Sequence, residues 1–160
     1  MKMFYAGIGS RETPKHILDL MANLAAVFRK SGYILNSGGA PGADQAFESG
    51  AMDKKQIFVP WDNFSGKKMN FQIPKECYDI ASELHPAWER LKPAVRSLMA
   101  RNVMQVLGYN LKEPVDFLVC WTPDACSSHA DRSHATGGTG LAISVADKYG
   151  IPIFNLCDDF

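Results

Sequence analysis

Three glycine-bearing segments of this chain have the composition of phosphate-binding loops. Two directly follow short apolar runs, and the third ends a polar loop, residues 122–140, that follows another apolar run. They are residues 7–11 (GIGSR), 37–44 (SGGAPGAD) and 136–140 (TGGTG). Glycine lets main-chain N–H groups approach an anion closely, and a helix that begins at such a loop adds favourable partial charge. One such loop alone is equally consistent with a tight turn, but three together predict a site for a phosphate-bearing ligand. The predicted lining residues are Gly9, Ser10, Arg11, Ser37, Gly38, Gly39, Gly42, Asp44, Arg101, Asn102, Trp121, Gly137, Gly138 and Thr139.

Charged side chains beside these loops could act on such a ligand. Arg11 could hold a phosphate through two hydrogen bonds, although a surface arginine before a helix has the same sequence context. Asp44 could accept a hydrogen bond from a ribose hydroxyl or an amine, or only favour the dipole of its helix. Glu48 lies one helical turn further along, so Asp44 and Glu48 are the candidate catalytic residues near a ribose. A solvated helix face is the alternative interpretation for Glu48.

Three further residues, two in a predicted helix and one at the end of a predicted strand, could contact the ligand. Arg101 and Asn102 lie in the middle of a predicted helix, where asparagine is a mediocre helix former. They would either contact the ligand or hydrogen-bond a neighbouring loop, and the loop contact is the simpler explanation. Trp121 ends an apolar run, where its ring could stack on a base or pack beneath a loop.

Cysteine and histidine residues give no recognisable metal site. Cys120, Cys126, His129 and His134 have the spacing C-x5-C-x2-H-x4-H, which matches no standard zinc site. We therefore expect no metal and no cofactor. The four cysteines include no CxxC pair and no disulfide-like spacing, which favours a reducing, cytoplasmic location.

Apolar periodicity predicts alternating strands and helices. Predicted strands are residues 3–8, 33–36, 56–61, 115–121 and 151–156, and predicted helices are 15–30, 42–52, 93–107 and 140–149. Residues 62–92 have no clear pattern. This alternation predicts a single α/β domain over residues 1–160, Rossmann-like and three-layered, with about five parallel strands and helices on both faces. In such a sheet the ligand binds beyond the carboxyl ends of the strands, where the three glycine segments fall.

The charge balance constrains the partners. Lysine plus arginine and aspartate plus glutamate number 17 each, so the chain lacks the net basic field typical of proteins that bind duplex DNA. Nucleic acid is therefore permitted as a partner but not favoured over a small ligand. The apolar run at the beginning of the chain is too short for a signal peptide. No other run reaches the ~18 apolar residues of a membrane span.

The ordered motifs GIGSRETP, NSGGAPGADQAFESGA, MARNVMQVLG, VDFLVCWTPD, TGGTGLAISVA and GIPIFNL resemble the SLOG superfamily. Within it, the chain is most similar to small, often phage-encoded relatives of the DNA-processing protein DprA. This resemblance covers nearly the whole chain and implies a Rossmann-like domain that binds nucleotides or nucleotide-derived ligands at the glycine loops. Arg101 and Asn102 match a recurrent Arg-Asn pair of these relatives, which often dimerise. The segment from Cys126 to His134 is longer than their usual connection and could form a lid or a specificity loop.

The resemblance leaves three functions open. The leading one is a nucleotide-binding sensor or sequestering protein. The second is an N-glycosidase (phosphoribohydrolase-like) that acts on nucleoside monophosphates, but the motif of that branch, PGGxGTxxE, lacks its Pro and its Glu in residues 136–144. The third is DprA-like binding of single-stranded DNA. Its candidate residues are Lys67, Lys68, Arg90, Lys92 and Arg96, with Trp61 and Trp88 for stacking.

Overall fold

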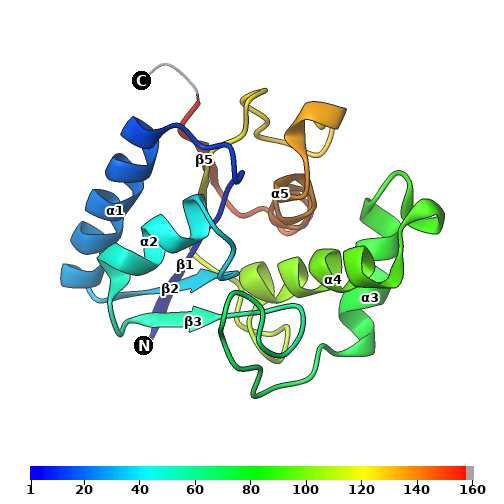
Figure 1. Cartoon of the computed structure of the whole chain (residues 1–160), viewed down its shortest axis with the longest axis horizontal. Coiled ribbons are helices and arrows are strands. Elements are labelled where there is room, and N and C mark those ends of the chain that lie inside the picture. Colours follow the sequence, from blue (N-terminus) through cyan, green and yellow to red (C-terminus); the bar gives the residue numbers. More distant parts are fainter. Residues whose placement is uncertain (158–160) are drawn as a thin grey trace.

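The chain folds around a five-stranded sheet in which all strands are parallel, in the order β3-β2-β1-β4-β5 (Figure 1). The structure is a computed structural model and describes residues 1–157. The strands are β1 (Met3–Gly7), β2 (Tyr33–Ser37), β3 (Lys55–Ile57), β4 (Phe117–Cys120) and β5 (Ile153–Asn155). The helices are α1 (Lys15–Lys30), α2 (Ala43–Ala51), α3 (Lys75–Leu84), α4 (Pro93–Leu107) and α5 (Thr139–Lys148), with short 3-10 turns η1 (Trp88–Arg90) and η2 (His134–Thr136).

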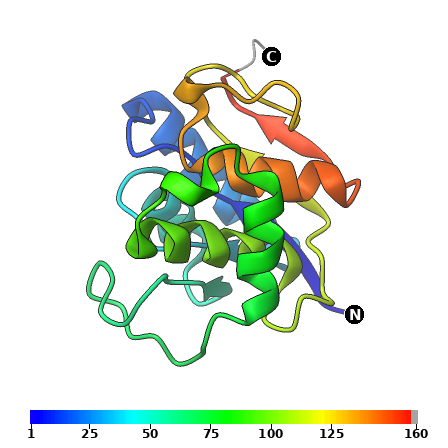
Figure 2. The same ribbon diagram turned by 90° about the vertical axis from the view of Figure 1, so that its right-hand side faces the viewer.

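Side-chain alternation along the strands divides the core into two layers. On β1, Phe4 and Ala6 face one side of the sheet, whereas Tyr5 faces the other. Helices α1 and α2 cover the Tyr5 side, and α3, α4 and α5 cover the opposite side (Figures 1 and 2). Both faces of the sheet are therefore buried, as parallel sheets require. This confirms the predicted three-layer α/β fold.

The strand order fixes where a ligand can enter. From β1 the chain adds β2 and then β3 on one side, and from β4 it adds β5 on the other side. The order of connection thus reverses between β1 and β4, which pair directly through Tyr5 and Phe117. Loops that leave neighbouring strands at such a switch point diverge and open a crevice at the carboxyl edge of the sheet. Among residues 1–157, no helix is long and apolar enough to cross a membrane.

Two parts of the fold differ from the prediction. The segment 62–92 is not wholly irregular, because it contains α3 and η1. Pro74 stands at the N-cap of α3, where a missing N–H costs nothing, and Cys77 and Ala81 face the core. The predicted strand 56–61 is limited to β3, and Phe58 still donates its N–H to the Ser37 carbonyl before the chain leaves the sheet.

Helices α1 and α2 touch each other at Gly50. A Cβ atom at this position would lie 2.1 Å from the carbonyl oxygen of Ala22 and 2.7 Å from the Cβ of Ala25. The two backbones can approach this closely only because residue 50 has no side chain. Arg29 adds a hydrogen bond from its Nε to the Gly50 carbonyl, at 3.1 Å.

We predict that Gly50→Ala destabilises the protein by about 1–3 kcal/mol, because the added methyl group forces two packed helices apart. Alanine normally stabilises a helix interior relative to glycine by about 1 kcal/mol, so the expected sign is opposite to the propensity effect. Urea unfolding of the variant, with the exposed α2 substitution Gln45→Ala as the control, measures the change. A Gly50→Ala protein as stable as the wild type would contradict the close contact.

Candidate functional site

A crevice of about 620 Å³ opens at the carboxyl edge of the sheet, beside the β1–β4 switch point. Its walls come from the loop after β1, the beginning of α2, the inner side of α4 and the turn that leads into α5. Nine of the predicted lining residues meet there: Gly9, Ser10, Arg11, Asp44, Arg101, Asn102, Gly137, Gly138 and Thr139. Ser37, Gly38, Gly39, Gly42, Trp121 and Glu48 are not among the residues that line it.

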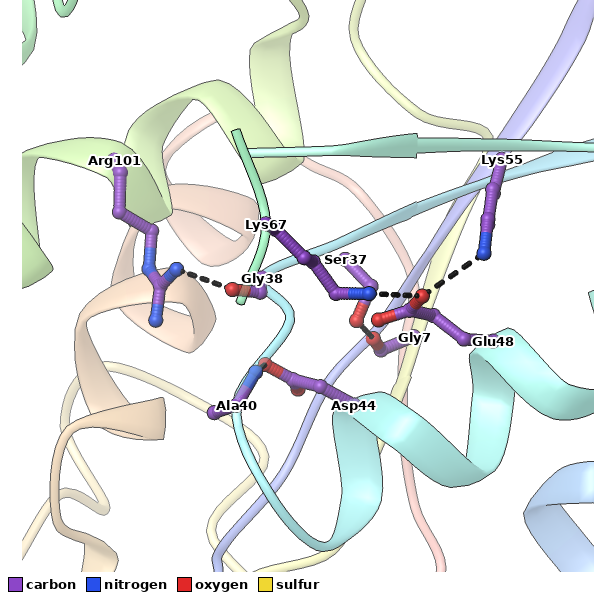
Figure 3. Close-up of polar contacts among 9 residues, drawn as sticks. All are labelled: Gly7, Ser37, Gly38, Ala40, Asp44, Glu48, Lys55, Lys67 and Arg101. Atoms are coloured by element: carbon purple, nitrogen blue, oxygen red, sulfur yellow. Dashed lines mark hydrogen bonds and ion pairs between the residues drawn. The ribbon is translucent and has the colours of Figure 1, made fainter. Parts of the chain in front are cut away.

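Arg101 is the centre of the buried polar structure behind the crevice. It is 5% exposed, and its Nη1 donates to the carbonyl oxygen of Gly38 at 2.7 Å (Figure 3). The same Nη1 donates to the carbonyl oxygen of Phe58 at 2.8 Å. Its Nε donates to Asn102 Oδ1 at 2.8 Å, and Asn102 Nδ2 donates to the Gly138 carbonyl at 3.1 Å. The Arg-Asn pair therefore connects the loop after β2, the end of β3 and the turn before α5. These bonds give Arg101 and Asn102 the simpler of the two predicted roles, which is contact with neighbouring loops.

The loop after β2 faces the protein's own side chains. A Cβ atom on Gly38 would lie 2.3 Å from Gln105 Nε2 and 2.7 Å from Arg101 Nη1. Gly39 has a φ of +75°, and a Cβ there would lie 3.0 Å from Cδ of Lys67. These glycines are required because other parts of the chain pack against them, which differs from the predicted role in approaching a ligand.

The remaining predicted residues outside the crevice brace its loops. Ser37 Oγ donates to the Gly7 carbonyl at 2.6 Å. Gly42, with a φ of +90°, passes the main chain of Arg11, where a Cβ would lie 3.1 Å from its Cα. The carbonyl of Trp121 accepts a hydrogen bond from the N–H of Ser10 at 3.2 Å, while its ring packs against the α1–α2 side of the core.

The beginning of α5 offers main-chain donors to the crevice. Within residues 1–157, the N–H groups of Gly138 and Thr139 have no hydrogen-bond acceptor, and no side chain caps the helix. Gly137 has a φ of +67°, and a Cβ there would meet no atom within 4 Å, so this glycine borders open space. Free N–H groups at the end of a ten-residue helix form a site that favours an anion.

Arg11 and Arg101 place two positive charges at the same crevice. Arg11 is exposed and makes no hydrogen bond or ion pair through its side chain in the described part of the chain. Burial lowers the pKa of Arg101 to about 10, the charge of Asp44 raises it and the nearby charge of Arg11 lowers it further. The carboxylates of Asp44 and Glu12 also line the crevice, so its charges are mixed rather than purely basic.

Asp44 is a buried acid with an unused oxygen. It is 4% exposed, and its Oδ2 accepts a hydrogen bond from the N–H of Ala40 at 3.2 Å (Figure 3). Its Oδ1 is buried and has no hydrogen-bond partner among the described residues. Burial raises the pKa of Asp44 to about 6, and the charge of Glu48 adds to this rise, whereas the Arg101 charge, the Ala40 N–H and the Ser37 hydroxyl oppose it.

The carboxylate of Glu48 is held by two lysines (Figure 3). Its Oε2 accepts from Lys67 Nζ at 2.9 Å and from Lys55 Nζ at 3.0 Å. Lys67 belongs to the long segment after β3, so this ion pair holds that segment over the loop after β2. Although Asp44 and Glu48 share a helix face, the structure does not bring both carboxylates into the crevice.

A network of side chains holds the long segment between β4 and α5. Asp124 accepts hydrogen bonds from Thr136 and Ser133, and its pKa lies below the usual range because these bonds outweigh the effect of burial. Asn155, at the end of β5, donates through Nδ2 to Thr122 Oγ1 at 2.7 Å and to the Cys126 carbonyl at 2.8 Å. These contacts position the turn that carries the free N–H groups.

The segment from Cys126 to His134 is anchored rather than open. Arg132 Nη1 donates to the Leu84 carbonyl at 2.9 Å and to Ser144 Oγ at 3.0 Å, and His129 Nδ1 contacts the same hydroxyl at 2.7 Å. The Cys126 thiol donates to the Ser128 carbonyl. No group of three or more possible metal ligands occurs among residues 1–157.

Several residues of the site were not predicted from the sequence. Leu98 and Met99 give the crevice an apolar wall, and Gln105 lies beside Arg101 on the same helix. Leu98, Arg101 and Gln105 stand at positions i, i+3 and i+7 of one helix. This spacing can be seen in the sequence, but it also fits an ordinary buried helix. Asp124 follows Trp121 closely in the sequence, and a polar side chain there could have been assigned to holding the next loop.

Comparisons with known proteins concern the fold. No family model matches the chain, and no curated protein matches it. A solved structure of DNA processing protein A from Helicobacter pylori, reported for its single-stranded DNA binding mode, superposes with a TM-score of 0.62. The two chains share 21% identity, and the match covers 96% of this chain. This chain spans 64% of the length of that protein. The likeness supports a DprA-like Rossmann fold.

We predict that Asp44→Asn changes how stability depends on pH. The pKa of Asp44 rises from 3.8 to about 6 on folding, so the folded protein holds more protons than the unfolded chain between these values. Wild-type stability therefore falls as pH rises through this window, by about 3 kcal/mol. The asparagine variant lacks this loss.

Urea unfolding at pH 4 and pH 7 measures the effect. The stability of Asp44→Asn relative to the wild type should improve by about 2 kcal/mol between the two pH values. The attraction of Arg101 for the ionised carboxylate is already part of this pKa, so it needs no separate correction. The control Asp53→Asn removes an exposed carboxylate and should follow the wild type, and an unchanged difference for Asp44→Asn would contradict the assignment.

Proposed function

We propose that the crevice binds the phosphate and sugar of a nucleotide. The free N–H groups at the beginning of α5 carry this proposal, since they lie in the same crevice as the unpaired guanidinium of Arg11. Together they can surround a phosphate with main-chain donors on one side and a bidentate side chain on the other. The volume of about 620 Å³ lies within the roughly 300–1,000 Å³ typical of small-ligand sites. Leu98 and Met99 provide an apolar surface for the base.

A nucleotide can reach the crevice in two forms, as a free small molecule or as part of a single strand. The likeness to DNA processing protein A, whose single-stranded DNA binding has been described, favours the strand. The equal numbers of acidic and basic residues and the buried Asp44 carboxylate favour a ligand with less negative charge than a DNA strand. The shared chemistry is a nucleotide phosphate, and binding measurements distinguish the two forms. Membership of the SLOG superfamily stays a prediction from the motifs.

The basic residues predicted for a strand are only partly available. Lys67 is paired with Glu48, and Arg96 donates twice to the Trp88 carbonyl while it stacks over the Trp88 ring, 5.1 Å from its centroid. Lys68, Arg90 and Lys92 are exposed. A strand that left the crevice would have these three side chains for its outer phosphates.

Cleavage of the ligand has less support than binding. An N-glycosidase needs an acid or base beside the sugar, and Asp44 is so placed, but Glu48 is held by two lysines outside the crevice. Bond cleavage therefore stays a prediction from the sequence resemblance. Release of free base from the four nucleoside monophosphates is its direct test.

We predict that Arg11→Ala weakens binding of nucleoside 5′-monophosphates roughly 10-fold or more, because it removes a charge-assisted hydrogen bond. The parent nucleosides should lose little affinity. Calorimetric titration with the four ribonucleoside 5′-monophosphates and their nucleosides measures both effects. Arg90→Ala, which removes an exposed arginine on η1, is the matched control. Equal losses for nucleotide and nucleoside would remove Arg11 from the phosphate site.

Oligonucleotides distinguish the strand from the free nucleotide. If a single strand is the ligand, a ten-residue oligodeoxythymidylate should bind more tightly than thymidine 5′-monophosphate. Its affinity should fall steeply with salt, because several phosphates are neutralised. If the free nucleotide is the ligand, the oligomer should show no such advantage at low salt. Failure of every nucleotide and every oligomer to bind would refute the proposed function.

A further inference from the structure

Arg101 keeps one nitrogen unused although its side chain is almost wholly buried. Its Nε donates to Asn102, and its Nη1 donates to the carbonyls of Gly38 and Phe58. Its Nη2 has no hydrogen-bond acceptor among residues 1–157, yet this atom is not sealed from solvent. Figure 3 shows the second terminal nitrogen pointing away from the Gly38 carbonyl. Because Arg101 lines the crevice, the two N–H groups of Nη2 are available to a ligand there.

Gln105 presents a second unpartnered group beside this guanidinium. It is 2% exposed, lines the crevice and makes no side-chain hydrogen bond within the described part of the chain. A Cβ atom on Gly38 would collide with both Gln105 Nε2 and Arg101 Nη1, so the amide and the guanidinium are neighbours. Both polar atoms of the amide keep some accessible surface, in contrast to Asp44 Oδ1. A primary amide can accept as well as donate, whereas a guanidinium can only donate.

We propose that Arg101 and Gln105 read the edge of the base, so that the crevice prefers a keto group beside a ring N–H to an amino group. This inference rests on the proposed function and names its substrate class. Nη2 donates to the keto oxygen, and the amide oxygen of Gln105 accepts from the neighbouring ring N–H. Guanine, hypoxanthine, uracil and thymine have this edge. Adenine and cytosine place an amino donor where the guanidinium offers only further donors.

The surroundings of this pair favour the base as the part of the ligand that it contacts. Leu98 stands one helical turn before Arg101 on the same face of α4, so their Cβ atoms are about 5–6 Å apart. A ring that packs against Leu98 therefore has its far edge at the guanidinium. The carboxylate of Asp44 could accept from an amino group, but Oδ2 is held by the N–H of Ala40 and Oδ1 is buried.

Two pairs of nucleotides that differ only in this edge test the inference. Wild-type protein is titrated by calorimetry with inosine and adenosine 5′-monophosphates, and with uridine and cytidine 5′-monophosphates. We expect the keto member of each pair to bind about 10-fold more tightly, because the amino member leaves buried donors unpaired. Ten-residue oligodeoxythymidylate and oligodeoxycytidylate form the corresponding pair for a single strand.

Gln105→Met isolates the contribution of the amide, because methionine fills a similar space without it. This variant should bind the keto members about fivefold more weakly, through the loss of one hydrogen bond, and the amino members nearly as well as the wild type does. Gln45→Met is the matched control, since Gln45 is an exposed residue of α2, and it should keep the wild-type affinities. Urea unfolding checks that both variants are folded.

Equal affinities within the wild-type pairs, or tighter binding of the amino members, would overturn the inference and leave the proposed function standing. This comparison needs no variant, so it decides the matter even if Gln105→Met is unstable. A folded Gln105→Met protein that keeps the full keto preference would also overturn the assignment of Gln105. Failure of every nucleotide and every oligomer to bind would instead refute the proposed function itself.

Discussion

The carboxyl edge of this sheet depends on one buried guanidinium. A charge removed from water is tolerated only when hydrogen bonds and an opposite charge replace its hydration. Arg101 meets this condition with the carbonyls of Gly38 and Phe58, the amide oxygen of Asn102 and the nearby charge of Asp44. Three segments far apart in the sequence must be in place before all these partners exist. The arginine therefore couples the formation of the loop after β2 to the docking of α4.

This constraint divides the glycine loops into two kinds. At Gly38 the missing side chain leaves room for Arg101 and Gln105, so the need for glycine arises inside the protein. At Gly137 no atom lies close to the position of a Cβ, so the need for glycine arises from its positive φ and leaves the N–H groups exposed to the crevice. Similar sequence motifs thus have different physical causes, and only the second kind is open to an external anion.

Much of the fold could be read from the sequence, because strands covered on both faces and amphipathic helices leave clear periodic patterns. Helix α4 was predicted at its observed bounds, since Pro93 at its beginning and Gly108 after its end are strong signals. Helix α3 was missed, because nearby prolines suggested a loop and because Cys77 and Ala81 are weakly apolar. The convergence of Asp44 and Arg101 follows from the parallel topology. The capture of Glu48 by Lys67 could not be predicted, because it depends on how a long irregular segment returns to α2.

The anchoring of the crevice wall by Asn155 has a consequence for how the protein is made. Asn155 hydrogen-bonds to Thr122, which precedes it by 33 residues, so the loop after β4 is synthesised well before its anchor. On a growing polypeptide the α5 turn lacks this support until β5 has left the ribosome and paired with β4. The segment that leads to the α5 turn therefore gains its full set of hydrogen bonds only when the last strand has joined the sheet.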